Sequence, residues 1–308
     1  MEFKKFTEKT AEGIKYFLGE VAEINIREIQ KNNGVLMHGI TILEKGSNLS
    51  PTIYLDGLYL EYLKGKTMGS VIKDIIEIYE KAKVKGRVNM DFFQDYEKVK
   101  SHIFCKLINY EKNKELLQEL PWRKFFDLAI VCYYVYTNDL IGNGSITIRR
   151  EHLELWGIKE EELLEEALNN TRHSLPYCWY DMKDMIKEMW ESEKGQLSLE
   201  EARLLQDIFR HRRDAEPMYV LTNFAKMYGA INMVYEDVLE EMGNMIGCNY
   251  VVLPSSIHEI ILVPGDTPNA EKLRFMVNDV NSTQVSPQEV LSDHVYFYDR
   301  NRRKLSMM

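Results

Sequence analysis

The dipeptide Asn33-Gly34 and its flanks constrain the fold of this chain more than any other stretch. Apolar and polar residues alternate on either side of it, with Ile24 before it and Ile40 after it in the apolar positions. Asn-Gly readily adopts the positive backbone torsions of a type I′ turn, and alternation with a period of two is typical of half-buried strands. The sequence therefore predicts a β-hairpin over residues 21–43.

The rest of the chain mixes helical and strand periodicity. Helices are expected near residues 3–18, 67–80, 159–168, 181–190, 199–209, 238–246 and 267–280. Strands are expected near residues 51–55, 103–108, 125–136, 145–148, 218–221, 230–234, 250–253, 257–263 and 295–298. Asn169-Asn170 is expected to end the helix that begins near Lys159.

Strands that pair locally, with helices returning over them, favour the α+β class over a doubly wound parallel sheet. We expect antiparallel hairpins and a mixed sheet with helices packed mainly on one face. The polar stretch 112–121 is read as a connection between two subdomains. The expected bounds are 1–118 for an N-terminal α+β subdomain that contains the hairpin 21–43, and 119–308 for a C-terminal α+β subdomain.

Composition excludes several classes of protein. The 308 residues are 45% hydrophobic, which is too apolar for a disordered chain. The net charge is −9, and it is uneven: residues 1–150 hold 23 basic and 20 acidic side chains, whereas 151–308 hold 16 and 28. An acidic chain disfavours nucleic-acid binding, because that function depends on a positive surface.

The sequence predicts a cytoplasmic protein that does not cross a membrane. The start of the chain is charged, and the longest apolar run, Leu128–Tyr136, is about half the length of a membrane span. The four cysteines are far apart in sequence, which fits reduced core thiols. No metal or cofactor is expected, because the sequence has no HExxH, GxxxxGK[ST] or GxGxxG motif.

The most site-like string is Ser255-Ser256 followed by His258-Glu259. A hydroxyl, an imidazole and a carboxylate near one loop would suit a hydrolase. Neighbours on a strand point to opposite faces, however, so His258 and Glu259 face one ligand only if the strand is bulged. The favoured alternative is a polar turn followed by a half-buried strand.

Cys178 is a second weak catalytic candidate, with His173, His258 or His294 as its base. It lies in the aromatic stretch Pro176–Tyr180, where a buried thiol packed among rings is the commoner outcome.

Two further patterns are weak candidates for binding. Arginine clusters stand against the acidic background and would make a patch for an acidic partner or a nucleic acid if the fold joined them. Their main members are Arg210, Arg212, Arg213, Arg302 and Arg303. Alternatively, they are a helix end and a solvated tail. Met185 and Met189 lie on one face of the helix expected over 181–190, where an adaptable apolar surface would contact a partner or a second copy.

Several strings are similar to a known family. They are Lys45–Tyr54, Leu107–Leu117, His152–Glu165, Pro217–Asn223 and Val251–Val263. Together they resemble a domain-of-unknown-function family of clostridial gut bacteria and their mobile elements, from near the N-terminus to about Arg300. The second half is more distantly similar to the YtpQ-like family. The resemblance implies a bacterial setting and carries over no catalytic residue.

We therefore expect a cytoplasmic binding or accessory protein of a bacterial host or mobile element, acting on a protein partner or on itself. The alternatives are a hydrolase that uses Ser255 and His258 or Cys178, and a nucleic-acid binder that uses the arginine clusters.

Overall fold

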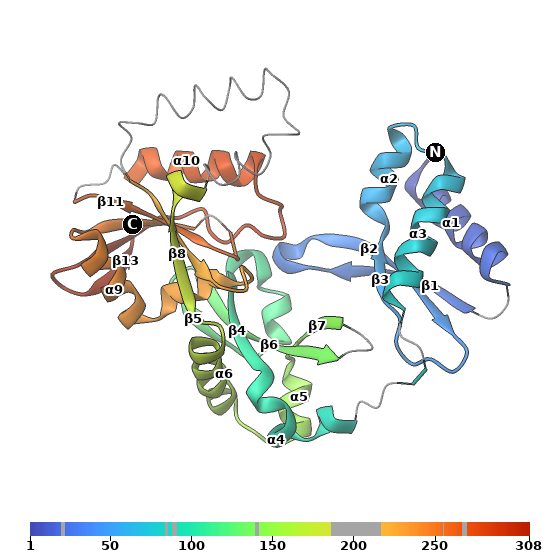
Figure 1. Cartoon of the computed structure of the whole chain (residues 1–308), viewed down its shortest axis with the longest axis horizontal. Coiled ribbons are helices and arrows are strands. Elements are labelled where there is room, and N and C mark those ends of the chain that lie inside the picture. Colours follow the sequence, from blue (N-terminus) through green and yellow to red (C-terminus); the bar gives the residue numbers. More distant parts are fainter. Residues whose placement is uncertain are drawn as a thin grey trace. The chain divides into compact units, whose positions relative to one another are not determined.

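The structure is a computed structural model, and it describes residues 1–19, 22–83, 86–87, 91–138, 142–185, 217–254, 256–266 and 270–308. The chain divides into two compact units, shown in Figure 1. Unit 1 comprises Met1–His102 and Tyr134–Thr147, and unit 2 comprises Ile103–Tyr133 and Ile148–Met308. Both units are discontinuous in sequence, whereas the expected subdomains 1–118 and 119–308 are continuous. The long strand β6 (Leu128–Asn138) contributes residues to both units.

Unit 1 holds a three-stranded antiparallel sheet with the order β1-β2-β3. Its elements are α1 (Phe3–Leu18), β1 (Ala22–Gln30), β2 (Leu36–Glu44), β3 (Thr52–Tyr54), α2 (Leu55–Leu63), α3 (Met68–Ala82), α4 (Tyr96–Val99) and β7 (Gly142–Thr147), with 3₁₀ turns η2 (Asn32–Gly34), η3 (Asp91–Gln94) and η4 (Lys100–His102). Asn33 and Gly34 both have positive φ, 61° and 69°. The predicted hairpin therefore forms around the predicted turn residues.

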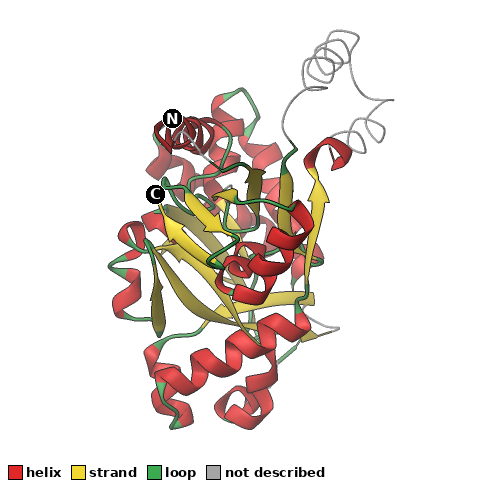
Figure 2. Cartoon of the chain, turned by 90° about the vertical axis from the view of Figure 1, so that its left-hand side faces the viewer, coloured by secondary structure: helices red, strands yellow, loops and turns green. Residues whose placement is uncertain are grey.

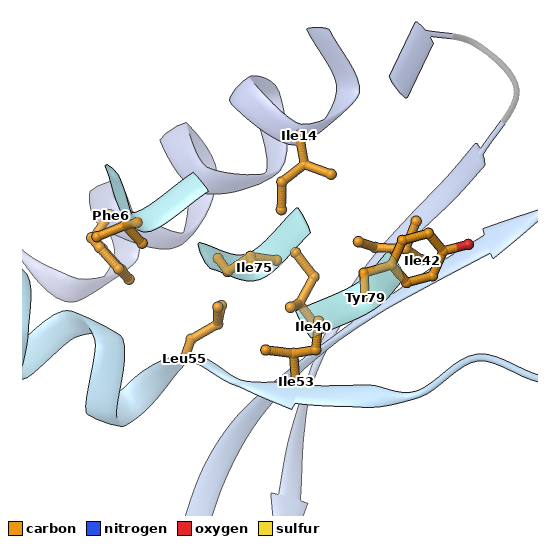
Figure 3. Packing of buried hydrophobic residues seen from close by; sticks show 9 residues of the cluster. Phe6, Ile14, Ile40, Ile42, Ile53, Leu55, Ile75 and Tyr79 are labelled. Atoms are coloured by element: carbon orange, nitrogen blue, oxygen red, sulfur yellow. The ribbon is translucent and has the colours of Figure 1, made fainter. Parts of the chain in front are cut away.

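The core of unit 1 lies between its helices and one face of this sheet. Figure 3 shows Phe6 and Ile14 of α1 and Ile75 of α3 packed over Ile40 and Ile53 of the sheet, and all five side chains are buried. These are positions that the helical and alternating patterns place on one face.

Unit 2 is built on a six-stranded sheet with the order β13-β12-β10-β11-β9-β8, in which every pairing is antiparallel. The strands of this sheet are β8 (Tyr177–Asp181), β9 (Tyr219–Asn223), β10 (Tyr250–Leu253), β11 (Ile260–Pro264), β12 (Tyr296–Asp299) and β13 (Lys304–Met307). Unit 2 also contains β4 (Ile103–Asn109) and β5 (Trp122–Phe125), which pair with β6 in another sheet. Its helices are α5 (Arg150–Trp156), α6 (Glu160–Ser174), α9 (Glu236–Ile246) and α10 (Ala270–Thr283), with 3₁₀ turns η5 (Glu111–Asn113), η6 (Leu116–Gln118) and η7 (Gly229–Val234).

The α+β class is confirmed, because helices and antiparallel sheets together make up the described chain (Figure 2). Val251 of β10 packs with Val277 of α10, whereas the hydroxyl of its neighbour Tyr250 donates to the carbonyl of Leu239 in α9. The six-stranded sheet is thus antiparallel throughout and has helices against both faces, where a mixed sheet covered mainly on one face was expected. All four residues of β10 are buried, so this strand shows no polar face.

Three segments differ from the sequence prediction. The strand expected at 230–234 is the buried 3₁₀ turn η7, because a short apolar run fits either structure. The strand expected from Phe125 begins at Leu128 instead, after the chain reverses through Phe126, which has a φ of 53°. Helix α6 continues past Asn170, whose side chain donates to the carbonyl of Ile103.

No helix in the described ranges is long and apolar enough to span a membrane.

Candidate functional site

The loop after β9 presents apolar side chains from a locked backbone. Asn223 is buried, its amide nitrogen donates to the carbonyl of Met227 at 2.9 Å, and its amide oxygen accepts from the Met227 N–H at 3.2 Å. Lys226 and Tyr228 hold left-handed backbone conformations, with φ of 51° and 56°. Such conformations persist only where the surroundings impose them. Phe224 at the tip is 71% exposed and Met227 is 40% exposed.

Gly229 joins this loop to the next one by a close backbone approach. A Cβ atom at this position would lie 2.3 Å from Thr222 Oγ1 and 2.6 Å from the carbonyl oxygen of His258. The Thr222 hydroxyl donates to that same carbonyl at 2.8 Å. Only glycine fits here, and η7 therefore begins directly against the loop that carries His258.

The loop between β10 and β11 uses two of the catalytic candidates for its own structure. The Ser256 hydroxyl donates to the Glu259 carboxylate at 2.7 Å and accepts from the backbone N–H of His258 at 3.0 Å. The Ser256 N–H also donates to the Glu259 carbonyl. Ser256 and Glu259 therefore hold the loop together, and Ser255 lies outside the described residues.

The His258 imidazole is oriented by the 223–229 loop. Its Nδ1 accepts from the backbone N–H of Tyr228 at 3.2 Å, so in the neutral form its proton is on Nε2. The two rings are stacked, with centroids 5.5 Å apart and planes 13° apart. Nε2 lies 3.8 Å from a carboxylate oxygen of Glu289, beyond hydrogen-bonding distance.

Two further side chains of unit 2, Lys106 and Tyr133, lie next to the Tyr228 ring. The ammonium of Lys106 on β4 lies 4.5 Å from the Tyr228 ring centroid and 5.7 Å from that of Tyr133. Tyr133 on β6 meets the Tyr228 ring edge-on at 4.9 Å. We call this set the His258 cluster; it comprises Lys106, Tyr133, Tyr228, His258 and Glu289.

Both phenols of the His258 cluster are neutral near pH 7. Burial raises the pKa of Tyr133, and the nearby Tyr228 phenol adds to the rise. Burial also raises the pKa of Tyr228, with a further contribution from the Glu289 carboxylate. Each hydroxyl therefore remains a hydrogen-bond donor at physiological pH.

The expected Cys/His combinations are not hydrogen-bonded to one another in the described residues. The Cys178 thiol is buried on β8 and donates to the Tyr180 hydroxyl at 3.5 Å. His173 is close to its own helix carbonyl at Asn169, and His294 lies against the Asp127 carboxylate. The hydrogen-bond partner of this thiol within the described residues is thus an aromatic residue of its own strand and not a histidine.

The binding candidates are only partly described. Arg302 lies 3.6 Å from the Asp299 carboxylate, and Arg303 lies 3.1 Å from that of Glu240, so both guanidinium groups have acidic neighbours. Met185 is half-buried in a helical stretch at 182–185. Arg210, Arg212, Arg213 and Met189 lie outside the described residues.

A cleft of about 820 Å³ lies elsewhere, in unit 1, between α1 and the ends of β1 and β2. Lys15, Ile24 and Leu43 are among its lining residues, and its described lining includes no histidine, cysteine or tyrosine. Within the described chain, no three acidic, histidine or cysteine side chains are grouped to hold a metal ion. The His258 cluster therefore differs from the described lining of this cleft in containing histidine and tyrosine side chains.

Sequence reasoning identified His258 but missed Lys106, Tyr133, Tyr228 and Glu289. The sequence does contain a pattern that could have drawn attention to Lys106, because it is the one charged residue in the apolar strand Ile103–Ile108. No such pattern distinguishes the two tyrosines or Glu289, because aromatic residues are common in cores and acidic residues are common at turns.

The fold and this cluster define an α+β protein with a preorganised surface loop next to a half-buried polar cluster. The model of a family of unknown function, DUF5688, matches residues 3–300, and the chain belongs to that family. Comparison with curated proteins found no match, and comparison with solved structures found none either.

Proposed function

We propose that this protein acts by binding a protein partner through the tip of the 223–229 loop. The observation that carries the proposal is the exposure of Phe224, at 71%, on a backbone locked by Asn223. A rigid loop loses little conformational entropy on binding, and aromatic and methionine side chains are enriched at the centres of protein interfaces. The partner would offer an apolar pocket for Phe224, with Met227 beside it.

The hydrolase alternative has less support from the same geometry. Ser256 donates to Glu259, and its hydroxyl contacts the backbone N–H of His258. A serine nucleophile needs its hydroxyl hydrogen-bonded to the basic nitrogen of the imidazole. Nδ1 of His258 is already occupied by the Tyr228 N–H, which leaves Nε2–H as a donor.

The proposed setting is the bacterial cytoplasm, in a clostridial host or one of its mobile elements. The support is the similarity of strings such as Pro217–Asn223 and Val251–Val263 to that clostridial family, with a more distant similarity of the second half to the YtpQ-like family. Nucleic acid is a disfavoured partner because of the net charge of −9.

The test is capture of partners from the native host by the full chain and by two matched variants. Phe224→Ala removes the proposed anchor, and Phe275→Ala removes an equally exposed phenylalanine, 76% exposed, from α10 of the same unit. We expect a partner that is retained by wild type and Phe275→Ala and that binds Phe224→Ala roughly tenfold or more weakly. Size measurements on the purified chain distinguish a second copy from another protein. Equal capture by all three chains would exclude the loop as the contact.

A further inference from the structure

One edge of the three-stranded sheet in unit 1 is open. Among the described residues, β1 pairs with β2 alone, and its register runs without a bulge from Ala22 opposite Glu44 to Gln30 opposite Leu36. At nine residues, β1 is the longest of the described strands that lie at a sheet edge. A long and regular edge strand exposes a row of backbone donors and acceptors that can pair with another strand.

The backbone groups that point to this open edge belong to the even-numbered residues of β1. The Lys31 N–H donates to the Val35 carbonyl at 2.7 Å, and hydrogen-bonded pairs recur at every second residue of an antiparallel ladder. Odd-numbered residues of β1 therefore bond to β2, whereas the backbone groups of even-numbered residues such as Ile24 point outward. Accordingly, Ile42, which lies opposite Ile24, donates its N–H away from β1, to the Ser50 hydroxyl.

The hydrophobic core of unit 1 is less covered along β1 than along the other two strands. Ile40 on β2 and Ile53 on β3 are 0% and 5% exposed, whereas Ile24 and Ile26 of β1 are only partly buried on the same face of the sheet. Ile24 also lines the cleft beside α1. A strand added to β1 would therefore cover apolar surface in addition to satisfying backbone groups.

The other face of β1 carries exposed charges of both signs. Glu23 and Arg27 lie there with Asn25 midway between them, and the Asn25 side-chain amide donates to the Glu23 carboxylate at 3.1 Å. No described carboxylate pairs with Arg27, whose neighbour on β2 is Gly39, a residue without a side chain. Proline, lysine and β-bulges commonly block a sheet edge, and β1 has none of the three.

We propose that two copies of this chain associate through β1, with the two strands antiparallel about a two-fold axis. When Asn25 lies opposite Asn25, each Glu23 lies opposite the Arg27 of the other copy, and each Ile24 lies opposite Ile26. The outward backbone groups of Ile24 and Ile26 then pair across the axis, as an antiparallel ladder requires. Opposite charges in cross-strand positions attract, so the strand is complementary to itself, as a two-fold contact demands. The two three-stranded sheets become one continuous sheet.

The first measurement is sedimentation velocity of the full chain over about a hundredfold range of concentration. We expect wild type to populate a dimer as the concentration rises. Glu23→Arg and Arg27→Glu each place like charges opposite one another twice in the dimer, and each is expected to weaken self-association about tenfold or more. The double variant Glu23→Arg/Arg27→Glu restores both pairs with reversed signs, and it is expected to recover the dimer.

A mixture of the two single variants provides a stricter test of the same pairs. The mixture is expected to form heterodimers, because every charge pair across the axis is then of opposite sign. Lys73→Glu is the matched control, since it reverses another exposed cation of unit 1, on α3, with the same change in net charge. It is expected to leave the dimer intact. Phe224→Ala is expected to leave it intact as well, so this proposal and the proposed contact of the 223–229 loop fail separately.

Asn25→Cys tests the register. The two thiols would face each other across the axis in a non-hydrogen-bonded pair, where opposite side chains are closest. Thiol–disulfide exchange with oxidised glutathione is therefore expected to give a covalent dimer on a non-reducing gel. The proposal is overturned if the chain stays monomeric over the whole range, if both single reversals leave the dimer unchanged, or if neither the double variant nor the mixture restores it. Absence of the cross-link in a chain that dimerises would overturn the register.

Discussion

Two groups of residues in unit 2 each pair a histidine with a carboxylate, and they differ in how fully their polar atoms are satisfied. In the first, which we call the His294 cluster, the members are Asp127, Ser292, His294 and Tyr296. The Asp127 carboxylate accepts from the Ser292 hydroxyl at 2.6 Å and from the Tyr296 hydroxyl, and it lies 3.2 Å from Nδ1 of His294. Its side chain is 13% exposed.

The His258 cluster has similar residue types and a different degree of pairing. Its histidine and carboxylate are 3.8 Å apart, and the hydroxyl of its buried tyrosine has no hydrogen bond within the described chain. A histidine next to a carboxylate is therefore not by itself evidence of a catalytic or ligand-binding site. The closed network of the His294 cluster joins the turn before β6 to the segment before β12, whereas the His258 cluster contains a buried hydroxyl that has no hydrogen bond within the described chain.

The largest expected effect is the loss of the acceptor in the His294 cluster. Asp127→Ala leaves two buried hydroxyls without an acceptor, and we expect it to lower the free energy of unfolding by about 3–5 kcal/mol. Urea unfolding of the full chain measures this. The matched control is Asp237→Ala, which breaks an exposed pair with Arg172 and is expected to cost no more than about 1 kcal/mol. Similar losses in the two variants would show that the His294 cluster is not a closed network.

Gly229→Ala tests whether the His258 cluster depends on a close backbone approach. The added methyl would lie 2.3 Å from Thr222 Oγ1 and 2.6 Å from the His258 carbonyl, so backbone must move. We expect a loss of about 1–3 kcal/mol in unfolding free energy. Gly69→Ala in α3, where the methyl meets open space, is expected to be neutral or stabilising by up to about 1 kcal/mol. A Gly229→Ala variant as stable as wild type would contradict this role of the glycine.

A pair of conservative substitutions contrasts the two clusters directly. Tyr296→Phe removes a hydroxyl that donates to Asp127, and it is expected to lower the free energy of unfolding by about 1–2 kcal/mol. Tyr133→Phe removes the unpaired hydroxyl, and it is expected to be neutral or stabilising by up to about 1 kcal/mol. The measurement is denaturant unfolding of both variants. Effects of the same sign would remove the distinction between closed and open clusters.

The smallest expected effect concerns a third histidine, His152, to which we assign a structural role. Burial lowers the pKa of His152 from its ordinary value of 6.5, and its Nδ1 accepts from the Arg149 N–H at the start of α5. Because the unfolded chain takes up the proton more readily, the neutral imidazole stabilises the fold above pH 6.5, and that stability is lost as pH falls through the folded pKa. We expect His152→Gln to show a weaker fall in stability between pH 7 and pH 5 than wild type. An unchanged pH dependence would contradict this assignment.

The local elements of this fold are largely readable from the sequence. The hairpin around Asn33-Gly34 forms in the expected place, because its alternation and its turn residues favour the same structure. Helix α3 begins after Thr67, whose side chain caps it, and buries the predicted face with Val71 and Ile75. These features depend on residues a few positions apart, for which the periodicity of side chains is sufficient evidence.

Tertiary contacts determined the secondary structure of the segments whose sequence pattern was ambiguous. Residues 230–234 form a buried 3₁₀ turn because Asn232 donates to the carbonyls of Thr222 and Gly229, which ties the segment to the end of β9. Helix α6 passes Asn170 because the next residue, Thr171, accepts from the backbone N–H of Cys105 on β4. Neither partner can be identified by reading the segment alone.

In the candidate site, too, some features can be predicted from the sequence and others depend on tertiary contacts. The sequence by itself determined that His258 lies at a loop next to a strand, and that Lys106 interrupts an apolar strand. Only the tertiary structure brought Lys106, Tyr133, Tyr228 and Glu289 around that histidine, from separate elements of unit 2. The physical reason is that periodicity reports which face of one element is buried, whereas the pairing of polar atoms depends on which other elements cover that face.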